Sequence, residues 1–354
     1  VFCKFVGGKG VTQALGVMLG FSPRLGRLTA VVWLAVSPAA WAVRGANFVQ
    51  SPQAAWGSDV ALVSLRRLQA LGADTVALVP FMRQSSPAAC DLAWDQHYNL
   101  ARIEAAMRQA ENAGLRVILK PQILVNGHWA GDIAPGDAAG WACWFNAYAA
   151  LIKDLAGLAE ARRATGLVVG TELKRTELRP EWRTLLSDVR KRYGGTLSYV
   201  FHDRVDVMRF PALDALDSVG LSLYPRLGET AAEAFRGTAW QRYGLRRWAA
   251  ALSKPVWFAE VGVPSRQGAG KTPWQWQADA DPAALADPGF QAEALANWLA
   301  ALRGDWHQGV LIWDWQSDPN GGGVRNTDFT PQNKPAEAVL RCFWQDEGMP
   351  ECAP

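Results

Sequence analysis

Eight short runs rich in β-branched and aromatic residues alternate with longer stretches of helical pattern from Arg44 onward. This alternation predicts a parallel sheet wrapped by helices, because each parallel strand pair needs a crossover long enough to hold a helix. The predicted strands cover 46–49, 75–81, 116–121, 167–171, 196–201, 218–223, 256–259 and 310–314. The predicted helices cover 59–71, 98–113, 139–161, 181–193, 231–252, 289–303 and 335–344.

Eight such units in about 310 residues fit one α/β domain, a single (β/α)8 TIM barrel. A doubly wound nucleotide-binding sheet would need a glycine-rich turn after its first strand. The residues at that place, Phe48-Val49-Gln50-Ser51-Pro52, contain no glycine. The sequence therefore favours the barrel over the doubly wound sheet.

The first 42 residues have the pattern of a leader. Arg24 and Arg27 precede an apolar run from Leu28 to Val36, and Ala40 and Ala42 have the spacing that a signal peptidase accepts. The alternative is a retained membrane span, although the run is shorter than the roughly 20 apolar residues that a span needs. We expect a removed leader and signal peptide over 1–42, a catalytic barrel over 43–345 and a C-terminal tail over 346–354.

The charge balance does not imply a polyanion as the partner. The chain has 36 Lys and Arg against 33 Asp and Glu, and removing the leader leaves 32 basic and 33 acidic side chains. We therefore expect no nucleic-acid partner, and no membrane association once the signal is cleaved. The expected mature protein is a monomer, secreted or periplasmic.

Four cysteines remain after the leader, an even number in a chain predicted for an oxidising compartment. Three pairings are possible, and we expect Cys342 with Cys352 and Cys90 with Cys143. The alternative is four buried free thiols. The histidines are scattered and no Cys-x-x-Cys occurs, so the sequence predicts no metal site.

Two glutamates end predicted strands. Glu172 follows the fourth strand and Glu260 ends the seventh. Catalytic side chains of such barrels lie at the carboxyl ends of the strands, and a pair of carboxylates facing one cavity is what glycosidic cleavage needs. Glu177 is a competing acid five residues after Glu172, and we interpret it as a solvated loop charge.

Other side chains are predicted to line the mouth of the barrel. Lys120 and His202 end the third and fifth strands, and Trp129 follows in the loop after the third. The chain has 18 tryptophans, and an indole with a polar edge suits flat, wet ligands such as sugar rings. We interpret Lys120, His202 and Trp129 as candidate substrate contacts.

The sequence resembles the retaining (β/α)8 glycosidases of clan A, and within that clan glycoside hydrolase family 113, the endo-β-1,4-mannanases and their relatives. The resemblance runs from about Gly45 to Trp344. The pieces that carry it, in order, are Leu119-Lys120-Pro121-Gln122 with Trp129-Ala130-Gly131-Asp132-Ile133, Val169-Gly170-Thr171-Glu172-Leu173, Val219-Gly220-Leu221-Ser222-Leu223-Tyr224-Pro225, Trp257-Phe258-Ala259-Glu260-Val261-Gly262, and the segment from Gly309 to Pro335.

The resemblance implies a role for each matching residue. Glu172 is the implied acid/base and Glu260 the implied nucleophile. Tyr224 would hydrogen-bond the nucleophile, and Trp313 or Trp315 would form the floor beneath the sugar. These two tryptophans point the same way on a regularly alternating strand, so the sequence does not separate them. Most of clan A has Asn before the acid/base, where Thr171 stands here, so the contact to the substrate 2-hydroxyl stays open.

The implied activity is that of a secreted retaining endo-glycosidase that hydrolyses a β-1,4-linked polysaccharide. Mannan is the expected substrate, and no metal or cofactor is expected. We expect the two carboxyl groups about 5 to 5.5 Å apart, and a raised pKa that keeps Glu172 protonated beside a second carboxylate. One alternative keeps both acids but acts on a glucan or an exopolysaccharide. The other is a non-catalytic barrel that binds polysaccharide through its tryptophans.

Overall fold

The computed structural model describes residues 17–20, 29–32, 43–275 and 285–345. The chain forms two compact units, Val1–Trp41 and Ala42–Pro354. In the first unit, β1 (Val17–Gly20) pairs antiparallel with β2 (Thr29–Val32). Most of the predicted leader and the whole of the predicted tail lie outside the described residues, so both boundaries stay predictions.

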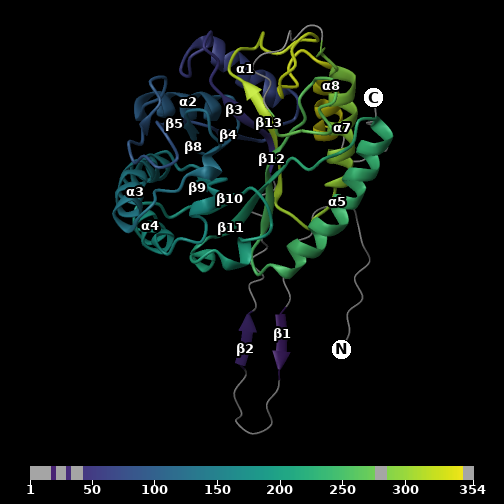
Figure 1. The fold of residues 1–354 in the computed structure, drawn as a ribbon. Helices are drawn as coiled ribbons and strands as arrows, with labels where there is room; N and C mark the ends of the chain where they lie inside the picture. Colours follow the sequence, from purple (N-terminus) through teal and green to yellow (C-terminus); the bar gives the residue numbers. More distant parts are fainter. Residues whose placement is uncertain (1–16, 21–28, 33–42, 276–284, 346–354) are drawn as a thin grey trace. The chain divides into compact units, whose positions relative to one another are not determined.

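Eight parallel strands of the second unit close into a barrel, in the order β3, β4, β7, β9, β10, β11, β12, β13 and back to β3 (Figure 1). The predicted (β/α)8 fold is therefore confirmed. The observed bounds are β3 (Val43–Val49), β4 (Thr75–Leu78), β7 (Arg116–Leu119), β9 (Gly166–Thr171), β10 (Thr196–Phe201), β11 (Ser218–Leu223), β12 (Val256–Val261) and β13 (Gly309–Gln316).

Helices surround the barrel and cover its apolar outer face (Figure 1). They are α1 (Asp59–Ala70), α2 (Leu100–Asn112), α3 (Ala138–Ala161), α4 (Glu181–Arg190), α5 (Ala231–Ala251), α7 (Pro288–Ala301) and α8 (Pro335–Gln345). The connection from β10 to β11 holds two short 3-10 turns, η4 (Val207–Arg209) and η5 (Leu213–Ala215). None of the helices in the described part of the chain has both the length and the apolar character to span a bilayer.

The second and third barrel strands continue beyond the barrel after a proline. The predicted single strand over 75–81 is wrong: β4 ends at Leu78, and β5 (Phe81–Gln84) begins after Pro80. β7 likewise gives way after Pro121 to β8 (Gln122–Val125). Proline has no N–H for the sheet ladder, so each strand ends there and its continuation forms a new pairing. β5 and β8 pair in parallel, and β6 (Ala93–Trp94) adds an antiparallel edge.

Much of the tryptophan content belongs to the core rather than to a binding surface. Five tryptophans are fully buried, namely Trp144, Trp182, Trp257, Trp298 and Trp315. Trp182 meets the ring of Tyr199 edge-on, with centroids 5.2 Å apart, behind β9. A Cβ on Gly170 of β9 would lie 2.5 Å from the Tyr199 ring, so only glycine fits there. The high tryptophan count is therefore poor evidence for sugar binding by itself.

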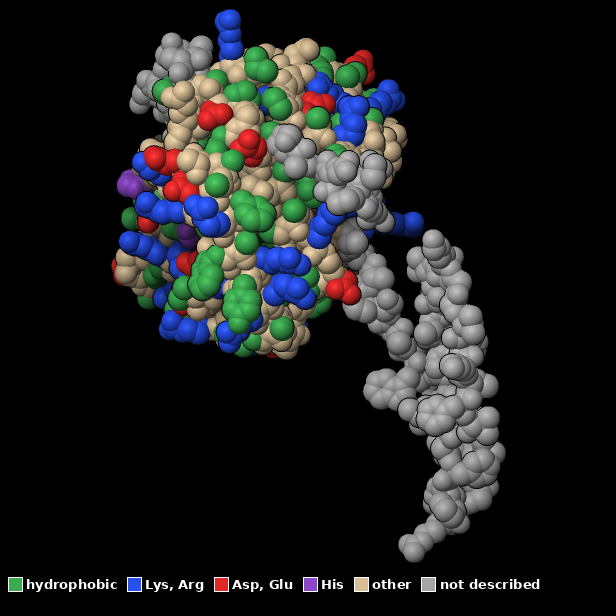
Figure 2. Space-filling view, turned by 90° about the vertical axis from the view of Figure 1, so that its right-hand side faces the viewer, with side chains coloured by type: hydrophobic (Ala, Val, Ile, Leu, Met, Phe, Trp, Pro, Cys, Tyr) green, Lys and Arg blue, Asp and Glu red, His purple; other side chains and the backbone are tan. Residues whose placement is uncertain are grey.

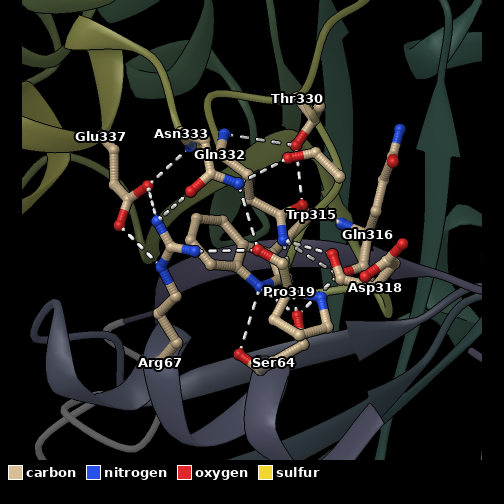
Figure 3. A network of polar contacts seen from close by, with 11 residues as sticks. Ser64, Arg67, Trp315, Gln316, Asp318, Pro319, Thr330, Gln332, Asn333 and Glu337 are labelled. Carbon is tan, nitrogen blue, oxygen red and sulfur yellow. Dashed lines mark hydrogen bonds and ion pairs between the residues drawn. The ribbon is translucent and has the colours of Figure 1, made fainter. Parts of the chain in front are cut away.

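A polar network fixes the segment after β13 to helix α1 (Figure 3). The buried Gln332 amide accepts from Gln316 N (2.6 Å) and donates to the carbonyl of Asp318 (3.0 Å). Arg67 of α1 donates to both carboxylate oxygens of Glu337 (2.9 and 2.6 Å). Since each buried polar group in this network has partners, the long connection from β13 to α8 is held in one conformation.

One of the expected disulfides is present. Cys90 and Cys143 are bonded, with their Cα atoms 5.9 Å apart, and the bond ties the β5–β6 connection to helix α3. Cys342 is also disulfide-bonded. Its expected partner, Cys352, lies outside the described residues, so that pairing stays a prediction.

Candidate active site

Glu260 lies near the carboxyl end of β12, with its side chain buried. The pairing of β12 with β11 shifts by one residue between Phe258 and Glu260, which is a β-bulge at the rim of the barrel. Such a bulge re-aims the side chain that follows it. Tyr224, just after β11, donates its hydroxyl to Oε2 of Glu260 (2.8 Å), so this predicted contact is present.

Two residues after β7 hold the other oxygen of Glu260. The Lys120 ammonium and the Gln122 amide (2.6 Å) both donate to Oε1. Lys120 and Gln122 flank Pro121, and both side chains reach the same carboxylate oxygen. Lys120 is fully buried and contacts the carboxylate, and its contact with substrate stays a prediction.

Sequence reasoning missed Gln122 as a site residue. The signal that could have found it is its place two residues after Lys120, at the end of a barrel strand.

Burial raises the pKa of Glu260, while the Lys120 ammonium opposes that rise and the Glu172 carboxylate adds to it. The three donors therefore favour the ionised carboxylate that burial disfavours.

Glu172 follows β9 with a positive φ of 54°. β9 also carries an extra residue relative to β10 between Val168 and Thr171, so both strands that bear a predicted catalytic glutamate bulge just before it. A left-handed conformation is unusual for a residue with a Cβ and is found often at functional sites. Glu172 and Glu260 thus emerge at the same end of the barrel.

His202 and Trp129 hold one oxygen of Glu172. His202 Nδ1 lies 3.3 Å from Oε2, and the Trp129 indole donates to the same oxygen (3.1 Å). The two rings pack with centroids 4.6 Å apart. Oε1 of Glu172 is buried and has no hydrogen-bond partner among the described residues. The two glutamates therefore differ: both oxygens of Glu260 are bonded, whereas Glu172 keeps one oxygen free.

The expected rise in the pKa of Glu172 is wrong for the free protein. Burial raises the pKa of Glu172, but the contacts with His202, the nearby Ser222 hydroxyl and Trp129 together outweigh burial and place the pKa below its usual value. The pKa of His202 moves the opposite way: burial lowers it, and the Glu172 and Asp203 carboxylates together raise it above its usual value. The pair therefore favours an ionised Glu172 beside a protonated His202.

The two tryptophans of β13 lie on different faces. Trp313 is near Lys120, whose Nζ lies 5.0 Å from its ring centroid, and it packs in a cluster with Val79 and Phe329 that borders Tyr224. Trp315 is fully buried and donates to Ser64 Oγ of α1 (2.9 Å). β13 carries an extra residue relative to β3 between Ile312 and Trp315, which breaks the alternation. Trp315 as a sugar contact is therefore wrong.

Glu177 is not the solvated loop charge that we expected. Its side chain is fully buried, and its nearest cation is Lys174, with Nζ 3.5 Å from Oε2. Burial raises the pKa of Glu177 to about 7. Glu177 is the other acid of the β9–α4 connection, and with this pKa it could exchange a proton near neutral pH. It is therefore the competing candidate for the acid/base role of Glu172.

The site offers no metal cage: in the described part of the chain, no three His, Cys, Asp or Glu side chains come together as ligands. Thr171, in the place of the clan's Asn, is buried, and its hydroxyl donates to the carbonyl of Pro121 (3.3 Å). The titratable side chains that the structure brings together around Glu172 and Glu260 are Lys120, His202 and Tyr224.

A closed (β/α)8 barrel with two glutamates of unequal environment at the ends of its fourth and seventh strands is an arrangement suited to a glycoside hydrolase. The family model of Glycoside Hydrolase Family 113 matches residues 47–334. The chain therefore belongs to glycoside hydrolase family 113.

Solved structures agree with this family. The family 113 β-mannanase of Alicyclobacillus acidocaldarius is 25% identical with a TM-score of 0.75, over 86% of this chain and 98% of that chain. A second family 113 β-1,4-mannanase, solved as a complex, is 26% identical with a TM-score of 0.74, over 86% and 99%. A β-glucuronidase from Ruminococcus gnavus shares the fold alone, at 13% identity and a TM-score of 0.57, over 86% of this chain and 50% of that chain.

One curated relative matches a short stretch only. A glycerol-3-phosphate acyltransferase of Nitrosospira multiformis is 60% identical over 37 residues, which cover 10% of this chain and 18% of that protein. So small a share says nothing about the activity of the barrel.

Proposed function

We propose that this protein is a retaining endo-glycosidase that hydrolyses β-1,4-mannan, with Glu260 as nucleophile and Glu172 as acid/base. The observation that carries the proposal is the unequal bonding of the two carboxylates. Three donors orient Glu260, as a nucleophile requires. Glu172 keeps Oε1 without a partner in the described structure, which leaves that oxygen for the glycosidic oxygen of a substrate. The solved β-mannanases of the same family support mannan as the substrate.

In the first step Glu260 attacks the anomeric carbon while Glu172 protonates the departing oxygen. The proton for this step belongs to the Glu172–His202 pair, and His202 holds it in the free protein. Bound substrate covers the partly exposed His202 and separates it from water, which favours the neutral forms of both side chains and moves the proton to Glu172.

In the second step Glu172, now ionised, takes a proton from water, and the water attacks the glycosyl-enzyme. The bond between Glu260 and the sugar breaks, and the carboxylate regains its charge beside Lys120. Retention by this route requires the two carboxyl groups to lie about 5 to 5.5 Å apart.

We also propose that the protein works outside the cytoplasm. The support is the leader pattern around Arg24, Arg27 and Ala42 together with the Cys90–Cys143 disulfide, since disulfides persist in oxidising compartments.

The test is a reducing-sugar assay on mannan, glucomannan, cellulose and xylan, followed by NMR of the first-formed anomer. We expect mannan to be cleaved best, with retention. Inversion, or cleavage of cellulose or xylan alone, would contradict the proposal. If the protein cleaves none of the four but retains mannan binding, the barrel is non-catalytic.

Variants assign the roles. Replacing Glu260 with Ala should abolish activity, and azide should restore a product of inverted configuration. Replacing Glu172 with Ala should remove proton transfer, typically worth 10² to 10⁴-fold, but spare glycosyl-enzyme formation from an activated aryl glycoside. Glu177→Gln is the control, because Glu177 is the buried competing acid. The assignment fails if Glu177→Gln, rather than Glu172→Ala, shows the acid/base behaviour.

A further inference from the structure

The outer face of α5 exposes large aromatic side chains. Trp240 is 76% exposed, and Tyr243, three residues further along the helix, is 61% exposed. Figure 2 looks onto the side of the molecule where α5 lies, and its lower half shows hydrophobic and basic side chains interleaved, with acidic ones sparse among them. Aromatic rings gathered on a surface in this way mark a binding site more often than single exposed side chains do.

A hollow of about 440 Å³ lies at this face, lined by Arg204, Trp240, Gln241, Tyr243, Gly244 and Arg247. Its size is within the range of small-molecule sites. Gly244 leaves the space that the Arg204 side chain crosses, because a Cβ there would lie 3.0 Å from Nη1 of Arg204.

The hollow is positively charged. Neither Arg204 nor Arg247 forms an ion pair with a carboxylate in the described residues. The Arg247 guanidinium lies 5.6 Å from the Tyr243 ring centroid, which fixes its orientation. α5 carries four arginines and one acid, Glu233, which is used in the N-terminal capping box. Two guanidinium groups without carboxylate partners favour a planar anion, which each can bind through two hydrogen bonds.

We propose that this hollow is a second, non-catalytic binding site for the acidic sugar units, such as uronates, of a polysaccharide. The exposed Trp240 ring offers a flat apolar face to the C–H bonds of a pyranose, as aromatic rings do for ligands that are apolar on one face. Arg204 and Arg247 bind the carboxylate, and the Gln241 amide reaches the hydroxyls.

A polysaccharide fits this site better than an anionic bilayer, because a sugar ring fills a hollow whereas a bilayer presses against a broad convex face. The choice of a polysaccharide as the source of the acidic unit rests on the proposed function. None of the residues that line the hollow belongs to the catalytic set around Glu172 and Glu260, although Arg204 follows His202 by two residues.

The test measures binding of full-length protein carrying Glu260→Gln, which keeps polymers intact. The probes are polygalacturonate, neutral β-1,4-mannan and vesicles of phosphatidylglycerol. The hollow variants are Trp240→Ala and the double variant Arg204→Gln with Arg247→Gln. The controls are Phe235→Ala and Arg236→Gln, exposed residues of the same helix outside the hollow.

We expect polygalacturonate binding to weaken at least about tenfold in both hollow variants and less than about twofold in both controls. Equal weakening in Arg236→Gln would mean general charge attraction and would overturn the proposal. So would no polygalacturonate binding at all, or Trp240-dependent binding to the vesicles alone. Mannan cleavage, measured in otherwise wild-type protein, should be unchanged by the hollow variants; if mannan is never cleaved while polygalacturonate binds, only the proposed function fails.

Discussion

The ammonium of Lys120 donates to the carboxylate of Glu260 from across the barrel, although the two residues are 140 positions apart and both are buried. A lone buried carboxylate would be costly to ionise, and a buried cation in contact with it reduces that cost. Lys120 is therefore expected to determine the pH at which the nucleophile becomes ionised.

Replacing Lys120 with Met should move the acidic limb of the kcat/KM profile to higher pH by about 1 to 3 units. Lys120 lowers the pKa of Glu260, so removing it raises that pKa, and the ionised nucleophile is lost earlier as pH falls. Gln122→Leu is the matched control, because it removes a neutral donor to the same oxygen and should shift the limb less. An unchanged acidic limb in Lys120→Met would refute this role.

Replacing His202 with Gln should move the alkaline limb of the same profile to lower pH. His202 carries the proton of the pair, and its pKa is raised by Glu172, so the wild-type pair keeps its proton to higher pH than Glu172 alone. Trp129→Phe removes a donor to the same oxygen without removing a titrating group and should leave the limb in place. If the alkaline limb lies at the same pH in wild type and in His202→Gln, the proposal that Glu172 and His202 share the catalytic proton is wrong.

The same pair predicts a pH window of stability. The raised pKa of His202 stabilises the fold below about 6.5, its unfolded value, and this contribution is lost as pH rises through the folded pKa. The lowered pKa of Glu172 stabilises the fold above about pH 4.3, its unfolded value, and this contribution is lost as pH falls through the folded pKa. The difference in unfolding free energy between wild type and His202→Gln should therefore be largest between these values, as measured by urea titration.

Of the two tryptophans of β13, Trp313 should affect activity on mannan and Trp315 should affect stability. Trp313→Ala should lower kcat/KM on mannan at least about tenfold, a loss of about 1.4 kcal/mol of transition-state binding. Trp315→Phe removes the hydrogen bond to Ser64 and should cost about 1 kcal/mol of stability with KM unchanged. Kinetics and thermal unfolding are measured for both variants. A raised KM in Trp315→Phe would contradict the conclusion that Trp315 does not contact the sugar.

Replacing Cys90 and Cys143 together with serine should destabilise the barrel by about 2 to 4 kcal/mol, since the bond closes a loop of 53 residues. The comparison is made without reductant, so that the disulfide of Cys342 stays intact in both proteins. If unfolded, unreduced mature protein titrates with four free thiols, the disulfide prediction is wrong.

The sequence alone determined the barrel and the places of its two glutamates. Strand and helix periodicity is a local property, so β10 and β11 have the bounds that the pattern predicts. The carboxyl ends of all strands of a parallel barrel meet at one face, so naming Glu172 and Glu260 as strand-ending acids was enough to bring them to one end.

Only the tertiary structure decided what surrounds those glutamates. Closure of the barrel pairs Lys120 with Glu260 and His202 with Glu172, contacts that no local pattern encodes. The pKa of Glu172 depends on that neighbour, so its direction could not be derived from the sequence. The bulge in β13 turns Trp315 away from the mouth, and the same packing buries Glu177. Bulges, burial and charge pairing arise from the fit between distant segments, and their effect on each side chain exists only once the barrel is closed.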